Sequence, residues 1–214
     1  MRQPMNTRIS SFVAIGIVML TAMSMGACVS FRPRASADTV QTYTFTGAVE
    51  SISPATSPAA KIGDRVTGLF IIDHTAVAIP VNERHVSYRF ASGTPLALTV
   101  NAIKFSATAL SFPCMASVAD NELSGDKPLD TFKMTCTDEA LLSSLNLTFL
   151  AATLNLSDSS AAVFSGPSLP REISLQTFDN ARLTVTGTRR CKKGEQCREL
   201  IFDILMRIDA ITKQ

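Results

Sequence analysis

Side chains able to bind a metal ion or to transfer protons gather between positions 73 and 85. This short segment contains both histidines of the chain and two carboxylates: Asp73, His74, Glu83 and His85. Imidazole and carboxylate groups together bind zinc and related metal ions, and the same groups act as general acids and bases. The competing interpretation is a set of polar residues at strand ends, with Asp73 capping a turn. The four residues are therefore a candidate metal or acid–base site.

The sequence contains no other catalytic signature. It has no G-x-S-x-G nucleophile elbow, no H-E-x-x-H motif and no glycine-rich loop that would cradle phosphate. With only two histidines in the chain, most hydrolytic mechanisms would depend on the segment 74–85. The sequence therefore predicts no further catalytic residue and no cofactor, and it favours a binding or structural role over an enzymatic one.

Cysteines point to an oxidising compartment. The chain has five, and four of them lie beyond the N-terminal region: Cys114, Cys136, Cys191 and Cys197. An even set of this kind is typical of exported proteins, in which disulfides persist. A bridge between Cys191 and Cys197 would clip the two arms of a hairpin and stabilise it by about 2 to 3 kcal/mol. We expect this bridge and a second one between Cys114 and Cys136.

Basic residues cluster around the second cysteine pair. The cluster consists of Arg189, Arg190, Lys192, Lys193 and Arg198. It is a candidate contact for an anionic surface, either acidic lipid, lipopolysaccharide or the acidic patch of a protein partner. The competing interpretation is a solvated turn whose charges discourage edge-to-edge pairing of strands.

The net charge of the chain comes from its first 27 residues. Of the 20 basic and 18 acidic residues, two arginines and no acid lie there, which leaves 18 of each sign in residues 28–214. Binding of nucleic acid depends on a basic surface that neutralises phosphates. The sequence therefore predicts no nucleic-acid partner.

Residues 1–27 have the organisation of an export signal. Arg2 and Arg8 give a positive start, an apolar run follows over 12–20, and Met-Gly-Ala precedes Cys28. This ending resembles the bacterial lipobox, in which the cysteine is lipidated and begins the mature protein, although Met25 stands where leucine is usual. We expect a signal peptide over 1–27, a tether over 28–38 and a lipid anchor on Cys28, which places the protein in the bacterial cell envelope.

Two other interpretations of the N-terminal region stay open. Cleavage after Ala37, behind the sequence Ala-Ser-Ala, would remove Cys28 and release a soluble periplasmic or secreted protein. Retention of the uncharged run 9–31 would give a transmembrane anchor, since the run approaches the roughly 20 residues that span a bilayer.

Beyond the tether the sequence is typical of β-structure. Runs rich in β-branched and aromatic residues occupy 40–49, 64–73, 85–90, 130–135, 147–156, 182–188 and 200–211. The ranges 96–100 and 103–107 flank Asn101-Ala102, a two-residue connection typical of a hairpin. Connectors are expected at 74–83, 121–128 and 157–171, and a short helix is expected from Thr137.

Roughly ten short strands without helical crossovers predict one all-β domain over 39–214. The connections are too short for the helix-linked units of a parallel sheet, and no repeat of fixed period is visible. The expected fold is a single antiparallel β-sandwich or barrel-like domain.

Two stretches carry a resemblance to known proteins. Residues 43–49 read Tyr-Thr-Phe-Thr-Gly-Ala-Val, and residues 62–73 read Ile-Gly-Asp-Arg-Val-Thr-Gly-Leu-Phe-Ile-Ile-Asp. They resemble the opening of a family of bacterial exported proteins, many with a PEP-CTERM sorting tail, in which F-T-G-x-V is followed by a Ser/Pro-rich gap and G-D-x-V-x-G-x-F-x-x-D. The resemblance implies an exported β-sandwich-like domain and carries no site or activity with it. This chain ends without a sorting tail, so retention at the surface would depend on the N-terminal lipid.

Together these patterns predict a function in outline only. We expect a non-enzymatic, lipid-anchored β-domain that binds or scaffolds another component at the cell surface. Its expected partners are the membrane, through the lipid, and an anionic surface or a protein. The alternative is a secreted or periplasmic enzyme that uses Asp73, His74, Glu83 and His85.

Overall fold

The computed structural model describes most of the expected β-domain. The described residues are 39–53, 60–91, 93–101, 103–107, 114–138, 149–188 and 201–214. The signal peptide, the tether with Cys28, the pair Cys191 and Cys197 and the basic residues 189–198 lie outside them. In the described part of the chain, no helix is long and apolar enough to cross a membrane.

Eleven antiparallel strands form one sheet, so the prediction of an all-β fold is confirmed. The strands are β1 (Val40–Ile52), β2 (Arg65–Asp73), β3 (Val77–Asn82), β4 (His85–Arg89), β5 (Leu96–Val100), β6 (Ile103–Ser106), β7 (Met115–Ser124), β8 (Lys127–Thr137), β9 (Phe149–Asp158), β10 (Asn180–Thr188) and β11 (Ile201–Lys213). Their order across the sheet is β3-β4-β7-β8-β9-β10-β11-β1-β2-β5-β6. Long-range pairing of β1 with β11 joins the two ends of the domain's sequence at the centre of the sheet.

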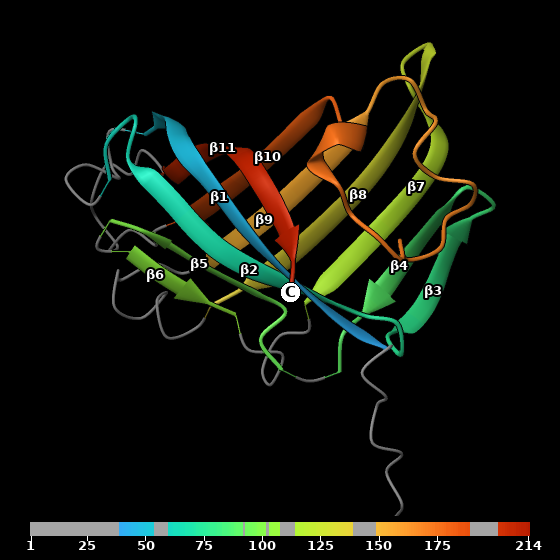
Figure 1. The fold of residues 1–214 in the computed structure, drawn as a ribbon, viewed down its shortest axis with the longest axis horizontal. Helices are drawn as coiled ribbons and strands as arrows, with labels where there is room; N and C mark the ends of the chain where they lie inside the picture. Colours follow the sequence, from blue (N-terminus) through green and yellow to red (C-terminus); the bar gives the residue numbers. More distant parts are fainter. Residues whose placement is uncertain are drawn as a thin grey trace, which may run out of the picture. The chain divides into compact units, whose positions relative to one another are not determined.

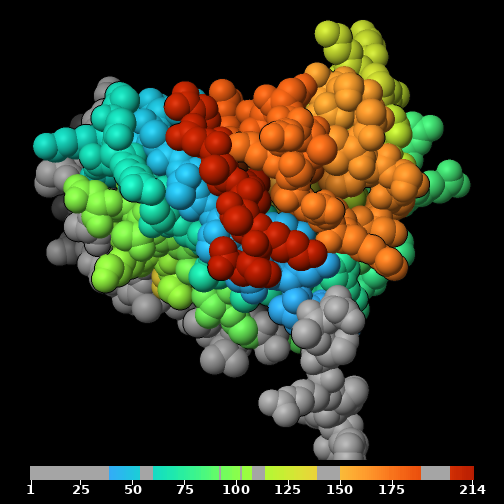
Figure 2. Space-filling model, viewed as in Figure 1, coloured from blue at the N-terminus to red at the C-terminus, as the bar shows by residue number. Residues whose placement is uncertain are grey.

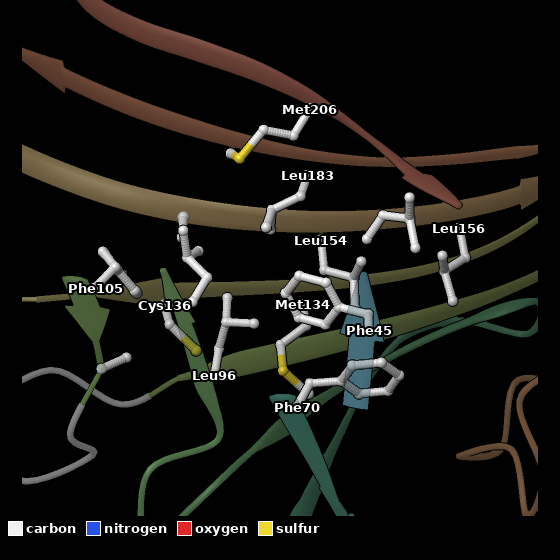
Figure 3. Packing of buried hydrophobic residues seen from close by; sticks show 14 of the residues in the cluster. Phe45, Phe70, Leu96, Phe105, Met134, Cys136, Leu154, Leu156, Leu183 and Met206 are labelled. Atoms are coloured by element: carbon white, nitrogen blue, oxygen red, sulfur yellow. The ribbon is translucent and has the colours of Figure 1, made fainter. Parts of the chain in front are cut away.

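The sheet curls around a single apolar core (Figure 1). Side chains from β2 and β5, such as Phe70 and Leu96, point toward the same interior as Leu154, Leu183 and Met206 from β9, β10 and β11 (Figure 3). All five are completely buried. Alternation of buried and more exposed residues along strands such as β1, β5, β8 and β10 produces this arrangement, because successive side chains of a strand point to opposite faces.

Several local predictions from the sequence are confirmed. Asn101 has a positive φ of 49° in the turn between β5 and β6, as a tight hairpin requires. The C-terminal run, whose periodicity also fits a helix, is strand β11, which pairs on one side with β10 and on the other with β1. The two neighbouring strands explain why this run is a strand and not a helix, because a helix could not form the inter-strand hydrogen bonds with either of them.

The segment 74–83, predicted as a connector, contains strand β3, so that prediction was wrong. β3 pairs with β4 from Val77 opposite Arg89 to Asn82 opposite His85 and forms one edge of the sheet. Pro80 made the segment look irregular, but an edge strand tolerates proline because one of its two sides needs no N–H donor. Val77 and Val81 remain 60% and 58% exposed on this strand.

The turn predicted over 121–128 is much shorter in the structure. β7 runs to Ser124 and β8 begins at Lys127, with Gly125 at a φ of 67° between them. A bulge at Asn121, which has a positive φ of 53°, supplied the polar irregularity that the sequence suggested. Thr137, predicted to begin a helix, ends β8. Asp138 follows it, is buried and accepts from the Ser106 N–H at 2.7 Å, and residues 139–142 of the predicted helix lie beyond the described residues.

Candidate functional site

The predicted cluster of histidines and carboxylates does not assemble. Asp73 ends β2 and His74 follows it, whereas Glu83 and His85 lie at the far end of β3. The six residues of β3 separate the two pairs by about 20 Å. Among the described residues, no group of three or more His, Cys, Asp or Glu side chains lies close enough to hold a metal ion. The structure therefore gives no support to the predicted metal site.

Asp73 and His74 instead have local roles. The Asp73 carboxylate accepts hydrogen bonds from the backbone N–H and the hydroxyl of Thr75, at 2.8 and 2.6 Å, and so caps the turn after β2. The His74 N–H donates to the Thr39 carbonyl at 2.8 Å. Burial lowers the pKa of His74, and the nearby charge of Arg171 lowers it further, whereas Asp73 raises it. The imidazole is therefore held toward its neutral form.

His85 has one carboxylate neighbour from another strand. Its Nδ1 lies 3.4 Å from a carboxylate oxygen of Glu122 on β7, and both side chains are partly open to solvent. Glu83 is exposed in the turn that follows β3. A histidine paired with one carboxylate provides two metal ligands at most, which is too few for a zinc site.

The predicted disulfide between Cys114 and Cys136 is confirmed. It joins the residue before β7 to the end of β8, beside the cross-strand pair Met115 and Thr135, with 4.4 Å between the two Cα atoms. Both cysteines are buried, at 0% and 1% exposure. Cys191 and Cys197 lie outside the described residues, and their pairing stays a prediction.

The long connection between β9 and β10 covers the inner face of the sheet. This segment, residues 159–179, is called the strap below, and it crosses in front of β7 and β8 (Figure 1). Its Leu169, Ile173 and Phe178 are buried in the core. In the space-filling view the strap fills the surface between β11 and the hairpin of β3 and β4 (Figure 2). The strap therefore closes the part of the core that the curled sheet leaves open.

Both tyrosines of the chain hold the strap to the sheet. The hydroxyl of Tyr88 donates to the Pro167 carbonyl at 2.8 Å, and the hydroxyl of Tyr43 accepts from the Ile173 N–H at 3.2 Å. Burial raises the pKa of each phenol, because the charged phenolate would lose its hydration. The Tyr88 hydroxyl therefore stays protonated and able to donate to the strap well above neutral pH, whereas the Tyr43 oxygen is an acceptor and needs no proton for its bond with Ile173.

Asp130 is the third anchor of the strap. Its side chain is completely buried, and it accepts three backbone hydrogen bonds at 2.8 Å, from Asn121 at the β7 bulge and from Val163 and Phe164 in the strap. One carboxylate thus fixes the bulge and the strap together. The sequence carried a signal of this role that we did not use: Asp130 occupies an inward position of a strand whose next inward residues are Phe132 and Met134. A polar residue at an inward position predicts a satisfied buried group.

Two hollows lie beside the strap. The larger, of about 560 Å³, is lined by Asp158, Val163 and four polar side chains of the strap: Ser160, Glu172, Ser174 and Thr177. Asp158 is already engaged there, since it accepts from Ser160 and from the Ala162 N–H. These hydrogen bonds lower the pKa of Asp158, with the Ser160 hydroxyl as the largest cause.

The smaller hollow, of about 270 Å³, has charged walls. Glu50, Arg182 and Arg207 are among its lining residues. Glu50 is the extra residue of a bulge in β1, and its carboxylate lies 3.6 Å from Arg182 and 4.0 Å from Arg207. Arg207 also contacts Asp209 at 2.7 Å, and this contact raises the pKa of the guanidinium. The trio gives the outer side of the sheet an ordered set of charges that the sequence analysis missed.

The chain has no detected relative that would assign a role to these features. Comparisons with protein-family models, with curated proteins and with solved structures find no match. The functional argument therefore depends on the residues of this chain.

Proposed function

We propose that this chain is an exported, lipid-anchored β-domain of the bacterial cell envelope that binds or scaffolds another component there. The observation that carries the proposal is the bridge between Cys114 and Cys136, in which both cysteines are buried and oxidised. Such a bridge persists in an oxidising compartment and is rare in the reducing cytosol. It agrees with the export signal that the first 27 residues resemble.

The proposed anchor is a lipid on Cys28. Residues 28–38 would then link the lipid to the start of β1, and an extended chain of 11 residues reaches at most about 36–40 Å. The lipid would hold the domain within that distance of the membrane. Relationship to the exported family with PEP-CTERM tails remains part of this proposal.

A binding role is favoured over an enzymatic one. Asp73 and His74 lie at the opposite end of β3 from Glu83 and His85, so the enzyme alternative lacks the assembled site on which it depended. The strap is held across the inner face by hydrogen bonds from Tyr88 and to Asp130, so what the described part offers a partner is its outer face and its edges.

Intact-mass measurement of the mature protein tests the anchor. We expect a chain that begins at Cys28 and carries the added mass of acyl groups, and we expect a Cys28→Ser variant to lose both the acyl mass and membrane association. A mature chain that begins at Asp38 without lipid would contradict the proposal and favour the soluble alternative. Metal analysis of the purified protein, with His74→Ala and His85→Ala as variants, tests the enzyme alternative.

A further inference from the structure

We propose that the outer face of the sheet binds a linear anionic polysaccharide along a row of basic side chains that crosses the strands. The row consists of Lys133 on β8, Arg182 on β10, Arg207 on β11 and Arg65 on β2, which we call the basic row. The inference deepens the proposed function, because export is what would give this face access to envelope polysaccharide. The binding itself is independent of the lipid.

Strand register places the four residues in one line. Lys133 and Arg182 both lie opposite Asn155 of β9, Arg182 lies opposite Arg207, and Ala48 of β1 lies opposite both Arg207 and Arg65. Residues directly opposite each other in antiparallel strands project from the same face. Across five strand spacings the row is therefore about 24 Å long, measured along the sheet.

The basic row lies on the side of the sheet away from the core. Its chain neighbours Met134, Leu183 and Met206 are completely buried, whereas all four basic side chains are exposed. No acidic residue occupies the row itself. The two acids that reach it, Glu50 and Asp209, contact Arg182 and Arg207 from beside the line.

Hydroxyl and amide groups flank the basic row. Thr135, Thr153 and Thr184 form the next line on one side, where the Thr135 and Thr153 hydroxyls hydrogen-bond to each other. On the other side Thr131 and Asn180 flank the buried Ser157, whose hydroxyl accepts from the Asn180 amide. Arginine and lysine bind carboxylate, sulfate or phosphate groups, and hydroxyls and amides bind sugar hydroxyls. The combination fits a polymer that carries both kinds of group.

Basic residues are unevenly distributed along the sequence. Residues 180–213, which include β10, β11 and their connection, contain eight basic and four acidic residues, a net charge of +4. Residues 28–179 contain ten basic and 14 acidic residues, a net charge of −4. Five of these eight basic residues lie between positions 189 and 198, outside the described residues, so only Arg182 and Arg207 of this stretch are placed in the row.

The shape and composition of the outer face favour a linear polymer over other anionic partners. A convex sheet can touch a flat bilayer along only part of the row, whereas a flexible chain can follow its curvature. A protein partner would need apolar anchors. No large apolar side chain occupies the row itself. Among those exposed in the described residues, Met115 lies on the outer face opposite Thr135, at the end of one flanking line; the others are Val40, Ile62, Val77, Val81 and Leu123.

Binding to polygalacturonate, a linear carboxylated polysaccharide, tests the proposal on the mature protein in neutral detergent. We expect salt-sensitive binding to this polymer and none to uncharged dextran. The variant Lys133→Gln with Arg65→Gln removes both ends of the row, and it should weaken binding about fivefold for each replaced residue. The matched control, Lys127→Gln with Lys213→Gln, removes the same charge outside the row and should bind as wild type.

A gain of binding separates a specific row from general charge. Glu50→Gln removes the acid that faces Arg182 and Arg207 and should tighten binding to polygalacturonate, whereas Asp126→Asn, which removes an acid from the exposed turn between β7 and β8, should leave binding unchanged. Equal loss in the two double variants would overturn the proposal, as would wild-type binding to phosphatidylglycerol vesicles but not to the polymer. None of these binding measurements depends on lipidation. The polysaccharide proposal can therefore be refuted while the lipid anchor is confirmed, and the anchor can be refuted while polysaccharide binding is confirmed.

Discussion

At the scale of single residues, the polar groups of the described core are used to hold backbone in place. Asp130 accepts from three N–H donors, and Tyr43 and Tyr88 each bind one strap residue. Buried polar groups stabilise a fold only when they are hydrogen-bonded, because an unpaired one keeps its full desolvation cost. These side chains therefore explain part of the stability of the domain.

Replacement of Asp130 by Asn tests the largest of these contributions. The amide has one acceptor oxygen and would place N–H groups against backbone N–H donors, so the three hydrogen bonds cannot all survive. We expect the free energy of unfolding in urea to fall by roughly 2 to 3 kcal/mol. Asp126→Asn, in the exposed turn after β7, is the control and should change it by less than about 0.5 kcal/mol. A similar loss in both variants would contradict the role of Asp130.

Asp158 predicts how stability depends on acid pH. Its hydrogen bonds with Ser160 and Ala162 lower its pKa below that of the unfolded chain, so the folded state favours the ionised form. This contribution is fully present above the unfolded pKa, near 4, and is lost as the pH falls through the lower folded pKa. We expect Ser160→Ala to destabilise the domain at pH 7 and to lose most of that effect at pH 2, measured by urea unfolding. A difference that does not change with pH would argue against the carboxylate as its source.

At the scale of elements, the strap and the strands β1 and β2 each depend on close packing against a neighbour. The strap is anchored from three strands: β1 through Tyr43, β4 through Tyr88 and β8 through Asp130. Gly47 in β1 and Gly68 in β2 are needed because a neighbouring backbone or aromatic ring occupies the space that a Cβ atom would fill. A Cβ on Gly68 would overlap the Phe45 ring and the Ala97 carbonyl oxygen. The stretches that resemble the exported family therefore have a packing reason in this fold.

Loss of the tyrosine hydroxyls should loosen the strap without unfolding the sheet. We expect Tyr43→Phe and Tyr88→Phe each to cost about 1 kcal/mol and to speed amide hydrogen exchange in residues 159–179. Because burial raises the pKa of Tyr88, the hydrogen bond that its hydroxyl donates to Pro167 should persist as the pH rises past 10 and be lost only when this phenol ionises, whereas the bond that Tyr43 accepts from Ile173 needs no phenol proton. Faster exchange spread evenly over β8 and β9 would instead indicate global destabilisation.

Gly68→Ala should be costly in a strand where alanine is otherwise acceptable. The added methyl group must displace Phe45 or the backbone of β5, and we expect a loss of about 1 to 3 kcal/mol in unfolding free energy. Thr67→Val, at the adjacent exposed position, keeps the β-branched shape and should be nearly neutral. Comparable losses in the two variants would show that β2 is sensitive at every position and would refute the packing argument.

At the scale of the whole molecule, one continuous core holds eleven strands, and three of the ten neighbouring pairs in the sheet join strands that are not consecutive in the chain. β1 pairs with β11, and the hairpin of β3 and β4 is inserted beside β7 rather than beside β2. Such pairing must close long loops of chain before any contact forms, which costs entropy. A crosslink within the sheet reduces that cost in the unfolded state.

The bridge between Cys114 and Cys136 should therefore contribute to global stability. It closes a loop with a sequence separation of 22 residues, for which the chain-entropy relation gives about 3 kcal/mol. We expect a Cys114→Ala and Cys136→Ala double variant to lose approximately this much in urea unfolding. The double variant Cys191→Ala and Cys197→Ala, compared in the same way, tests the second predicted bridge. Peptide mapping without reductant that finds free thiols at 191 and 197 would refute that bridge.

The sequence by itself determined the fold class, most strand positions and one disulfide. These follow from local signals: alternation along β2, a positive-φ residue in the turn at Asn101, and cysteines that bracket β7 and β8. The sequence did not predict β3. Pro80 and the exposed valines do not indicate a strand by themselves, and only the pairing with β4 shows that they belong to an edge strand. The candidate metal cluster was wrong for a related reason. Residues that are close in sequence are far apart in space when an extended strand lies between them, because the strand holds its two ends a full strand length apart.

Only the tertiary structure decided which residues meet across the sheet. Strand order and register brought Lys133, Arg182, Arg207 and Arg65 into one line, although 142 positions separate the first and last of them in the chain. Register depends on the sum of pairings over the whole core, which no short stretch of sequence encodes. One disulfide and most strands could be inferred from local stretches of sequence, whereas the surface proposed for binding exists only after folding.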